Sequence, residues 1–350
     1  MRLSAIGDVC HTLPVVRTIQ DHWPETHLTW IIGKLEHQLV GDIPGIEFIV
    51  YDKRGGKAAK RHVVDMLGDR EFEALLHMQV ALRSSLLARK VRTPVRIGFD
   101  RPRARDWQWL FTNQRIAARE REHVMDSLFG FSDALGIPRP RQPRWDIPVP
   151  ERNRSEAEQL LPGDQPTLLI SPCSSQRARN FRNWSVARYA AVADHAARQH
   201  GVRTIITGGP TTLEREYGEA IAETVQQAEV INVVGKTSLK TLYGLLGRAS
   251  VVLCPDSGPA HMANAANTPV IGLYATSNPL RTGPHDSLAW TVNRYPDALQ
   301  KALGKTVDEV RWGQRVRDPD AMDVIEVSDV TANLDALSVA GFPELRPPLC

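Results

Sequence analysis

The segment spanning residues 251–274, VVLCPDSGPAHMANAANTPVIGLY, constrains the fold of this chain more than any other. Residues 251–254 form an apolar run of strand length, which Pro255 and a tight polar turn end. The small residues of 260–266 then predict a helix, and residues 270–274 predict a second buried strand. The segment therefore reads as a strand–turn–helix–strand unit of an α/β protein.

The turn of this unit is a candidate binding site for a phosphate or diphosphate. A helix that begins there directs backbone N–H groups and the positive end of its dipole at whatever lies above the sheet. Gly258 permits close approach of a ligand, and Pro259 suits a first helical turn because it has no N–H to lose. The alternative is an ordinary β–α turn whose small residues only allow close packing of helix on sheet.

Composition limits the class of protein. The chain has 350 residues, 42% of them hydrophobic and 24% charged, which suits a globular protein of two domains. No run approaches the roughly 18 apolar residues that a membrane span needs, and the first residues do not form an apolar signal segment. The four cysteines lack metal-ligand spacing, so we expect reduced thiols in a cytoplasmic protein. A net charge of +3 gives no argument for nucleic acid.

Alternating strand and helix patterns predict two doubly wound parallel sheets. Residues 138–150 carry five prolines and read as a linker, because neither a helix nor a central strand accepts such a run. We therefore expect one Rossmann-like domain over 1–145 and a second over 146–350. The expected strands are 28–32, 47–51, 74–78, 96–99, 167–171, 203–207, 230–233, 251–254 and 270–274. The expected helices are 9–21, 35–40, 63–67, 84–90, 122–135, 186–200, 212–226, 238–247 and 260–266.

Basic residues cluster in the first of these domains, where Asp100 is the only acid between Arg83 and Arg105. Such a cluster is either a solvated surface or a patch that faces a polyanion or a phosphorylated acceptor at a membrane surface. The second reading makes the following residues candidates for acceptor binding: Lys53, Arg54, Lys57, Arg101, Arg103 and Arg105.

Two motifs at opposite ends of the chain resemble glycosyltransferase family 9, the ADP-heptose:lipopolysaccharide heptosyltransferases. DSGPAHMANAANTPVIGLY resembles the C-terminal signature of that family. SAIGDVCHTLP, residues 4–14, resembles its N-terminal S-x-x-G-D-x-x-x-x-x-P segment. The resemblance implies the GT-B fold, in which two Rossmann-like domains face a central cleft, with residues 1–145 binding the acceptor and 146–350 the nucleotide sugar. It also suggests a C-terminal tail that packs back on the first domain.

The resemblance assigns catalysis to Asp8, which matches the proposed general base of the family. From the residues alone, the favoured interpretation of Asp8 is the cap of the helix that follows it. Transfer of a glycosyl group to a hydroxyl needs a group that takes the hydroxyl proton. His11, one turn later, ranks second, either orienting Asp8 or lining the cleft.

Donor-binding residues follow from the same resemblance. Ser174 and Ser175 would contact phosphate, and Arg182 stands where the family has a lysine, which keeps the charge but changes its geometry. Asp256 would hold sugar hydroxyls, while Glu214 reads either as a ribose contact or as an exposed helical glutamate. The remaining donor candidates are Thr237, Ser257, Gly258, Pro259 and His261.

These inferences predict an inverting transferase that moves a heptose from ADP-L-glycero-D-manno-heptose to the Kdo residue of the lipopolysaccharide inner core. We expect no metal and no cofactor, with the acceptor at the cytoplasmic face of the inner membrane. The H-T-L-P form of the N-terminal motif favours the enzyme that adds the first heptose. The alternatives are a non-catalytic nucleotide- or polyanion-binding protein of the same fold, and a transferase for another nucleotide-activated sugar.

The start of the chain raises one further hypothesis. Only Met1-Arg2-Leu3-Ser4 precedes the Ala5–Asp8 turn, and four residues fall short of the usual central strand of about five or six. We therefore expect the central position of the first sheet to be partly empty, and an apolar extension upstream in the native protein.

Overall fold

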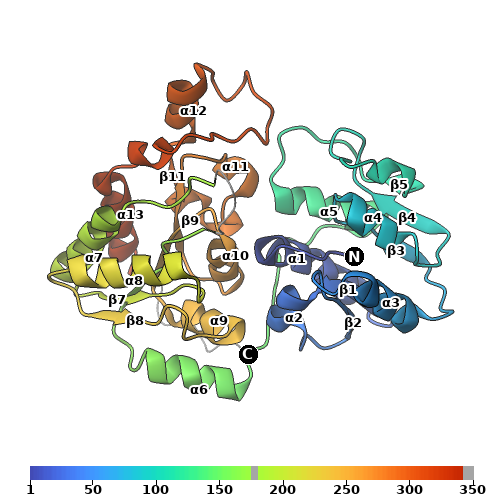
Figure 1. The fold of residues 1–350 in the computed structure, drawn as a ribbon, viewed down its shortest axis with the longest axis horizontal. Coiled ribbons are helices and arrows are strands. Elements are labelled where there is room, and N and C mark those ends of the chain that lie inside the picture. Colours follow the sequence, from blue (N-terminus) through green and yellow to red (C-terminus); the bar gives the residue numbers. More distant parts are fainter. Residues whose placement is uncertain (175–179, 342–350) are drawn as a thin grey trace. The chain divides into compact units, whose positions relative to one another are not determined.

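The structure, a computed structural model, describes residues 1–174 and 180–341. The chain divides into two compact units, Met1–Pro148 and Val149–Cys350 (Figure 1). Trp145 explains why the first unit extends to this point, because its indole is buried and donates to the Cys10 carbonyl at 2.7 Å. Val149 is buried beside Gly244 and therefore belongs to the second unit.

The first unit contains helices that cover short parallel strands. Its helices are α1 (Ile6–His22), α2 (Lys34–Val40), α3 (Gly56–Leu67), α4 (Leu82–Ala88) and α5 (Val124–Ala134), with a 3₁₀ turn at Gln108–Leu110. Its strands are β1 (Leu28–Gly33), β2 (Ile46–Tyr51), β3 (Ala74–Leu76), β4 (Val95–Gly98) and β5 (Gln114–Arg115). β1 pairs with β2, and β4 lies between β3 and β5, all in parallel.

Residues 1–4 lie between β1 and β3 without forming a regular strand. The Arg2 N–H donates to the Ile31 carbonyl at 3.2 Å, and the Met78 N–H donates to the Met1 carbonyl at 3.2 Å. Met1 and Leu3 are buried in the core of this unit. The expectation of a partly empty central position is therefore wrong, because two alternate apolar side chains suffice to fill it. With this segment in place, the order β2, β1, 1–4, β3, β4, β5 is that of a doubly wound fold.

The second unit is a six-stranded parallel sheet flanked by helices. Its strands are β6 (Thr167–Ile170), β7 (Arg203–Ile206), β8 (Val230–Asn232), β9 (Val251–Pro255), β10 (Val270–Tyr274) and β11 (Val292–Asn293). Its helices are α6 (Glu151–Leu160), α7 (Val186–His200), α8 (Thr212–Thr224), α9 (Leu239–Arg248), α10 (Gly258–Ala265), α11 (Pro279–Thr282), α12 (Tyr295–Leu303) and α13 (Val327–Val339), with 3₁₀ turns at His285–Trp290 and Ala321–Val324.

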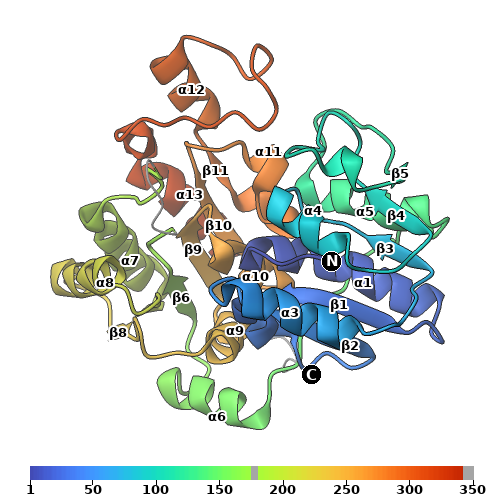
Figure 2. The ribbon, with the colours of Figure 1, turned by 45° about the vertical axis from the view of Figure 1, so that its right-hand side comes forward.

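The strand order of this sheet, β8-β7-β6-β9-β10-β11, is doubly wound. Every residue of β6, β7, β9 and β10 is buried, as expected for central strands covered on both faces. Helix α7 packs with α8 and α13, while α9 packs with α6 and α10 (Figure 2). The direction of winding reverses between β6 and β9, and ligands of such folds bind at the carboxyl ends of the strands there.

Helix α13 closes the second unit. Val330, Leu334 and Leu337 belong to its core, and the Trp184 indole donates to the Ile325 carbonyl at 3.1 Å. Residues 342–350, where the expected C-terminal tail falls, lie outside the described residues. Among the described residues, no helix is both long and apolar enough to cross a bilayer. Cys10, Cys173 and Cys254 are free and buried.

Candidate active site

The donor candidates of the second unit gather at the carboxyl ends of its parallel strands. Ser174 follows β6, Gly209 follows β7, Thr237 follows β8 and Asp256 follows β9. Because parallel strands present their carboxyl ends at one edge, residues far apart in the sequence are brought to the same side of the sheet. Ser175 lies outside the described residues.

Arg182 and Asp256 form a buried pair at the point where the winding reverses. Arg182 Nη1 lies 3.1 Å from Asp256 Oδ2 and donates to the Asp256 backbone carbonyl at 2.7 Å. Ser277, which follows β10, donates its hydroxyl to Asp256 Oδ2 at 2.6 Å. The side chains of Arg182 and Asp256 are only 11% and 10% exposed, so each fixes the rotamer of the other. The sequence analysis named both residues as donor candidates, but it did not predict their contact.

Helix α10 begins beside this pair. Ser257 is its N-cap, in extended backbone conformation, and Pro259 lies in the first turn. The Ser257 hydroxyl makes no capping bond, so it leaves the first-turn N–H groups to other partners. His261, Asn264 and the alanines of this helix are buried against the sheet. A helix start beside a guanidinium is an arrangement that stabilises an anion.

Ser174 is held by two asparagines that the sequence analysis missed. Its backbone N–H donates to Asn183 Oδ1 at 2.9 Å, and Asn180 Nδ2 donates to its hydroxyl at 3.0 Å. Both asparagines lie in the segment that joins β6 to α7. In the sequence, the run of polar residues after a buried strand could have indicated these two asparagines.

Glu214 lies in the first turn of helix α8, whose N-cap is Thr211. Its two carboxylate oxygens accept from the Gly209 N–H at 2.8 Å and from the Thr211 hydroxyl at 2.6 Å, and Thr211 caps Glu214 in return at 3.3 Å. Glu214 is therefore half-buried and not an exposed helical glutamate, while its contact with ribose stays a prediction. Thr237 is half-buried in the loop after β8, and this loop is joined to the β7 loop by a bond from the Gly235 N–H to the Gly208 carbonyl at 2.9 Å.

Asp8 lies in the first turn of α1, not at its N-cap as the sequence suggested. The N-cap is Ala5, because the helix begins at Ile6. Asp8 Oδ2 accepts from the Ala5 N–H at 2.9 Å and pairs with Arg2 Nη2 at 2.7 Å. Arg2 is itself anchored by bonds to the Ser4 and Met78 carbonyls. The Asp8 side chain is 37% exposed, so it remains accessible to a ligand.

His11 is buried in the same helix. Its ring lies edge-on to that of His123, with centroids 5.4 Å apart, and His123 Nδ1 accepts from the Met125 N–H at 3.2 Å. This arrangement places His11 in the packing between α1 and α5.

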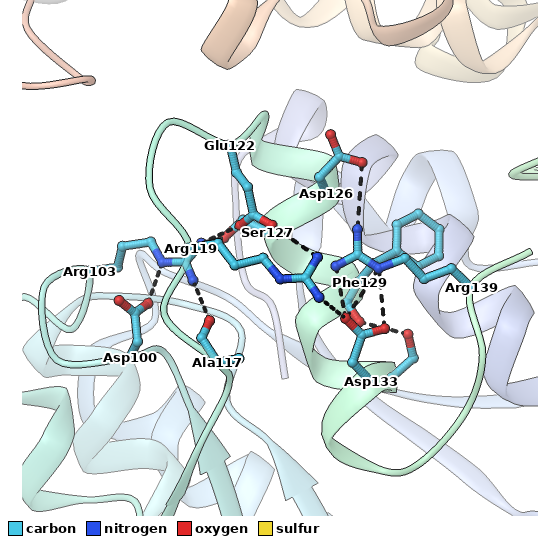
Figure 3. A network of polar contacts seen from close by, with 11 residues as sticks. Asp100, Arg103, Ala117, Arg119, Glu122, Asp126, Ser127, Phe129, Asp133 and Arg139 are labelled. Atoms are coloured by element: carbon cyan, nitrogen blue, oxygen red, sulfur yellow. Dashed lines mark hydrogen bonds and ion pairs between the residues drawn. The ribbon is translucent and has the colours of Figure 1, made fainter.

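Two of the six acceptor candidates form ion pairs with buried acids of the first unit. Lys53 Nζ lies 2.9 Å from Oε1 of Glu36, which is only 3% exposed. Arg103 binds Asp100, Glu122, Ser127 and the Ala117 carbonyl in the network of Figure 3. Their expected role in the acceptor patch does not fit these contacts, because each charge compensates a buried acid.

The other four candidates are exposed: Arg54, Lys57, Arg101 and Arg105. Arg101 lies 5.7 Å from the ring centroid of Trp109. The same loop exposes Trp107 and Leu110, each by 62%. Exposed aromatic and aliphatic side chains beside cations are typical of surfaces that bind a membrane interface.

Comparison with known proteins identifies the family. Residues 61–309 match the family described as glycosyltransferase family 9 (heptosyltransferase). The chain is 39% identical to the lipopolysaccharide core heptosyltransferase OpsX of Haemophilus influenzae, over 97% of this chain and 96% of that protein.

Solved structures agree in fold. A family 9 glycosyltransferase of Veillonella parvula has a TM-score of 0.78 at 22% identity, over 97% of this chain and 96% of the other. The Escherichia coli heptosyltransferase WaaC with ADP-2-deoxy-2-fluoro heptose has a TM-score of 0.65 at 22% identity, over 80% and 90%. The fold is accordingly GT-B, and the chain belongs to glycosyltransferase family 9, the heptosyltransferases.

Proposed function

We propose that this enzyme transfers a heptose from ADP-L-glycero-D-manno-heptose to a Kdo residue in the inner core of lipopolysaccharide, by a single inverting displacement. Membership of the family supports heptosyl transfer. The name of the H. influenzae relative supports the lipopolysaccharide core, and the ligand of the E. coli neighbour supports an ADP-heptose donor. The H-T-L-P motif favours addition of the first heptose.

The donor half of the mechanism concerns the negative charge that develops on the departing ADP. Arg182 supplies a guanidinium that Asp256 holds through its carboxylate and its carbonyl. The start of α10 adds roughly half a positive charge from the helix dipole. Both groups are fixed before the substrate binds, so stabilising the leaving diphosphate costs little reorganisation. The buried Arg182–Asp256 pair at the reversal of the sheet is the observation that carries this half.

The acceptor half depends on Asp8, which takes the proton of the attacking Kdo hydroxyl as the new bond forms. Arg2 and the Ala5 N–H bind the same oxygen of this carboxylate and hold its orientation. Arg2 is thus a positioning residue in this mechanism. It does not accept the proton itself, because a guanidinium stays charged.

The acceptor is a lipid, so the enzyme works at the cytoplasmic face of the inner membrane. Arg101 and Arg105 contact anionic headgroups, while Trp107 and Leu110 enter the interface. The exposure of these side chains supports peripheral binding.

Transfer in vitro tests the proposal. The purified chain receives ADP-heptose with Kdo-terminated lipid A, and parallel reactions receive ADP-glucose, UDP-glucose or an acceptor that already carries the first heptose. We expect product only with ADP-heptose and the unheptosylated acceptor, and inversion at the anomeric carbon by NMR. Turnover with the heptosylated acceptor alone would contradict first-heptose addition, and turnover with another donor alone would contradict the assigned sugar.

A further inference from the structure

Two histidines and one carboxylate converge on a single point between helices α7 and α13, which pack together (Figure 1). His195 Nε2 lies 2.7 Å from Asp335 Oδ1, and His200 Nε2 lies 2.6 Å from the same oxygen. The three atoms lie within 4.8 Å of one another. The imidazoles come from α7 and the carboxylate from α13, so the cluster joins the last helix of the unit to an inner one.

The hydrogen bonds of this cluster are compatible with more than one tautomer of His200. An ionised carboxylate only accepts, so each imidazole must present an N–H at Nε2 to Asp335. On its other side, His200 Nδ1 lies 3.0 Å from the Ser338 hydroxyl. A hydroxyl both donates and accepts, so Ser338 is compatible with a proton on either nitrogen of His200. With its proton on Nδ1, His200 can therefore present a lone pair at Nε2 and keep its hydrogen bond to Ser338.

We propose that His195, His200 and Asp335 form a binding site for Zn²⁺. Imidazole nitrogen and carboxylate oxygen are preferred zinc ligands, and sites with three protein ligands take a water in the fourth position. The side chains are 25%, 16% and 47% exposed, so the ion and its water have access from solvent. Ser338 supplies the outer hydrogen bond that orients a metal-bound imidazole and fixes its tautomer.

The geometry needs the two Nε2 atoms, which lie within 4.8 Å of each other, to approach by up to about 1.5 Å, and each to move slightly away from Asp335. Ligand distances of about 2.0–2.1 Å in a tetrahedral site separate two ligand atoms by about 3.3 Å. Each Nε2 must then move away from Oδ1 by less than about 1 Å, which rotation of the half-exposed Asp335 side chain allows. On binding, a neutral imidazole shifts its proton from Nε2 to Nδ1, and a protonated one also releases a proton to solvent. The ion thus replaces two hydrogen bonds with three coordinate bonds between the same helices.

Direct binding of Zn²⁺ by tag-free protein tests this site. Chelator-treated protein competes with a chromogenic zinc chelator, in a Cys350→Ser background that removes one thiol as a ligand. We expect one ion per chain, and at least a tenfold weaker affinity in His195→Gln and in Asp335→Asn. His27→Gln alters an exposed histidine of the other unit and should leave binding unchanged. Cobalt in place of zinc should give visible bands of nitrogen and oxygen ligation, without thiolate charge transfer.

Thermal unfolding provides a second readout that separates a metal site from a simple hydrogen-bonded contact. Zn²⁺ at 100-fold excess over the dissociation constant of the parent should raise the Tm of the parent by a few degrees, and that of each variant by no more than about half as much. The proposal is overturned if the parent binds no ion, or if both variants bind it as tightly as the parent. A lower Tm in the variants without any response of the parent to zinc would identify the cluster as a structural contact only. Transfer activity is not needed for either readout, so the result is independent of the proposed function.

Discussion

Asp8 provides the sharpest test of the mechanism, because the structure separates the catalytic role proposed for it from its structural one. Both donors that bind it, the Ala5 N–H and Arg2, converge on Oδ2. In Asp8→Asn the amide oxygen can take that position, so both contacts survive while the basic group is lost. In Asp8→Ala both contacts disappear together with the base.

The two variants should therefore differ in stability but not in rate. Loss of a capping acceptor costs about 1 kcal/mol, and a half-exposed ion pair adds about 0–1 kcal/mol. We expect Asp8→Ala to lose roughly 1–2 kcal/mol of unfolding free energy and Asp8→Asn less than half of that. Loss of a general base lowers the rate by roughly 10²–10⁴-fold, and both variants should show it.

Single-turnover transfer, ADP titration calorimetry and denaturant unfolding of the same preparations measure these quantities. ADP affinity should stay unchanged in both variants, because ADP makes no demand on the base. If Asp8→Asn keeps the turnover of the parent enzyme, Asp8 is a capping residue only and the acceptor half of the mechanism is wrong. Matched losses of rate and stability in Asp8→Ala alone would lead to the same conclusion.

Three other predictions concern the donor site, the charged surface and the response to pH. Arg182→Ala should weaken ADP binding by roughly 10- to 150-fold, the value of one charge-assisted bond of about 1.5–3 kcal/mol, with Arg182→Lys in between; equal affinities by calorimetry would remove Arg182 from the site. Added salt should raise the KM of the lipid acceptor more than that of the donor, since exposed charges are screened beyond about 8–10 Å. Equal effects of salt on the two KM values would contradict a role of the exposed cations in acceptor binding. Arg103 pairs with a buried acid instead, so Arg103→Gln should lower the Tm. Hydrogen bonds from Arg294 hold the pKa of Asp329 below its usual range. The stability that this depressed pKa contributes is fully present above the pKa of Asp329 in the unfolded chain, and it is lost as the pH falls through the pKa in the folded protein. Below about pH 4 the Tm of the parent should therefore fall more steeply than that of Asp329→Asn. Parallel curves of Tm against pH would show that the Arg294–Asp329 pair contributes nothing to stability.

Much of the fold could be predicted because buried parallel strands leave apolar runs of recognisable length. The unit from Val251 to Tyr274 appears as expected, although its strand continues through Pro255 and its helix starts at Gly258. Few of the side-chain roles followed in the same way. Lys53 looked like a surface charge because its partner Glu36 lies 17 positions before it in the sequence. Arg103 has one acid close by, Asp100, but Glu122 follows 19 positions later, and the sequence does not show that the arginine joins the two.

Contacts that depend on strand order could not be predicted from the sequence. Ser277 binds Asp256 only because β10 lies beside β9, and Arg2 reaches Asp8 only because residues 1–4 lie between β1 and β3. The N-cap of α1 was misplaced for a local reason. A carboxylate in the first turn reaches back to the cap N–H as readily as a cap side chain reaches forward, and both patterns place an acid near a helix start.

The packing of α13 on α7 has a consequence for synthesis on the ribosome. The core of the first unit is complete once residue 148 has left the exit tunnel. The second core includes Leu337, so α7 and the central strands lack their last cover until nearly the whole chain has been made. At about 5–20 residues per second, the interval between the two events is roughly 10–40 s. During that time the nascent chain carries a finished domain followed by an incompletely covered apolar sheet, and such exposed apolar surface makes a partly folded chain prone to aggregate.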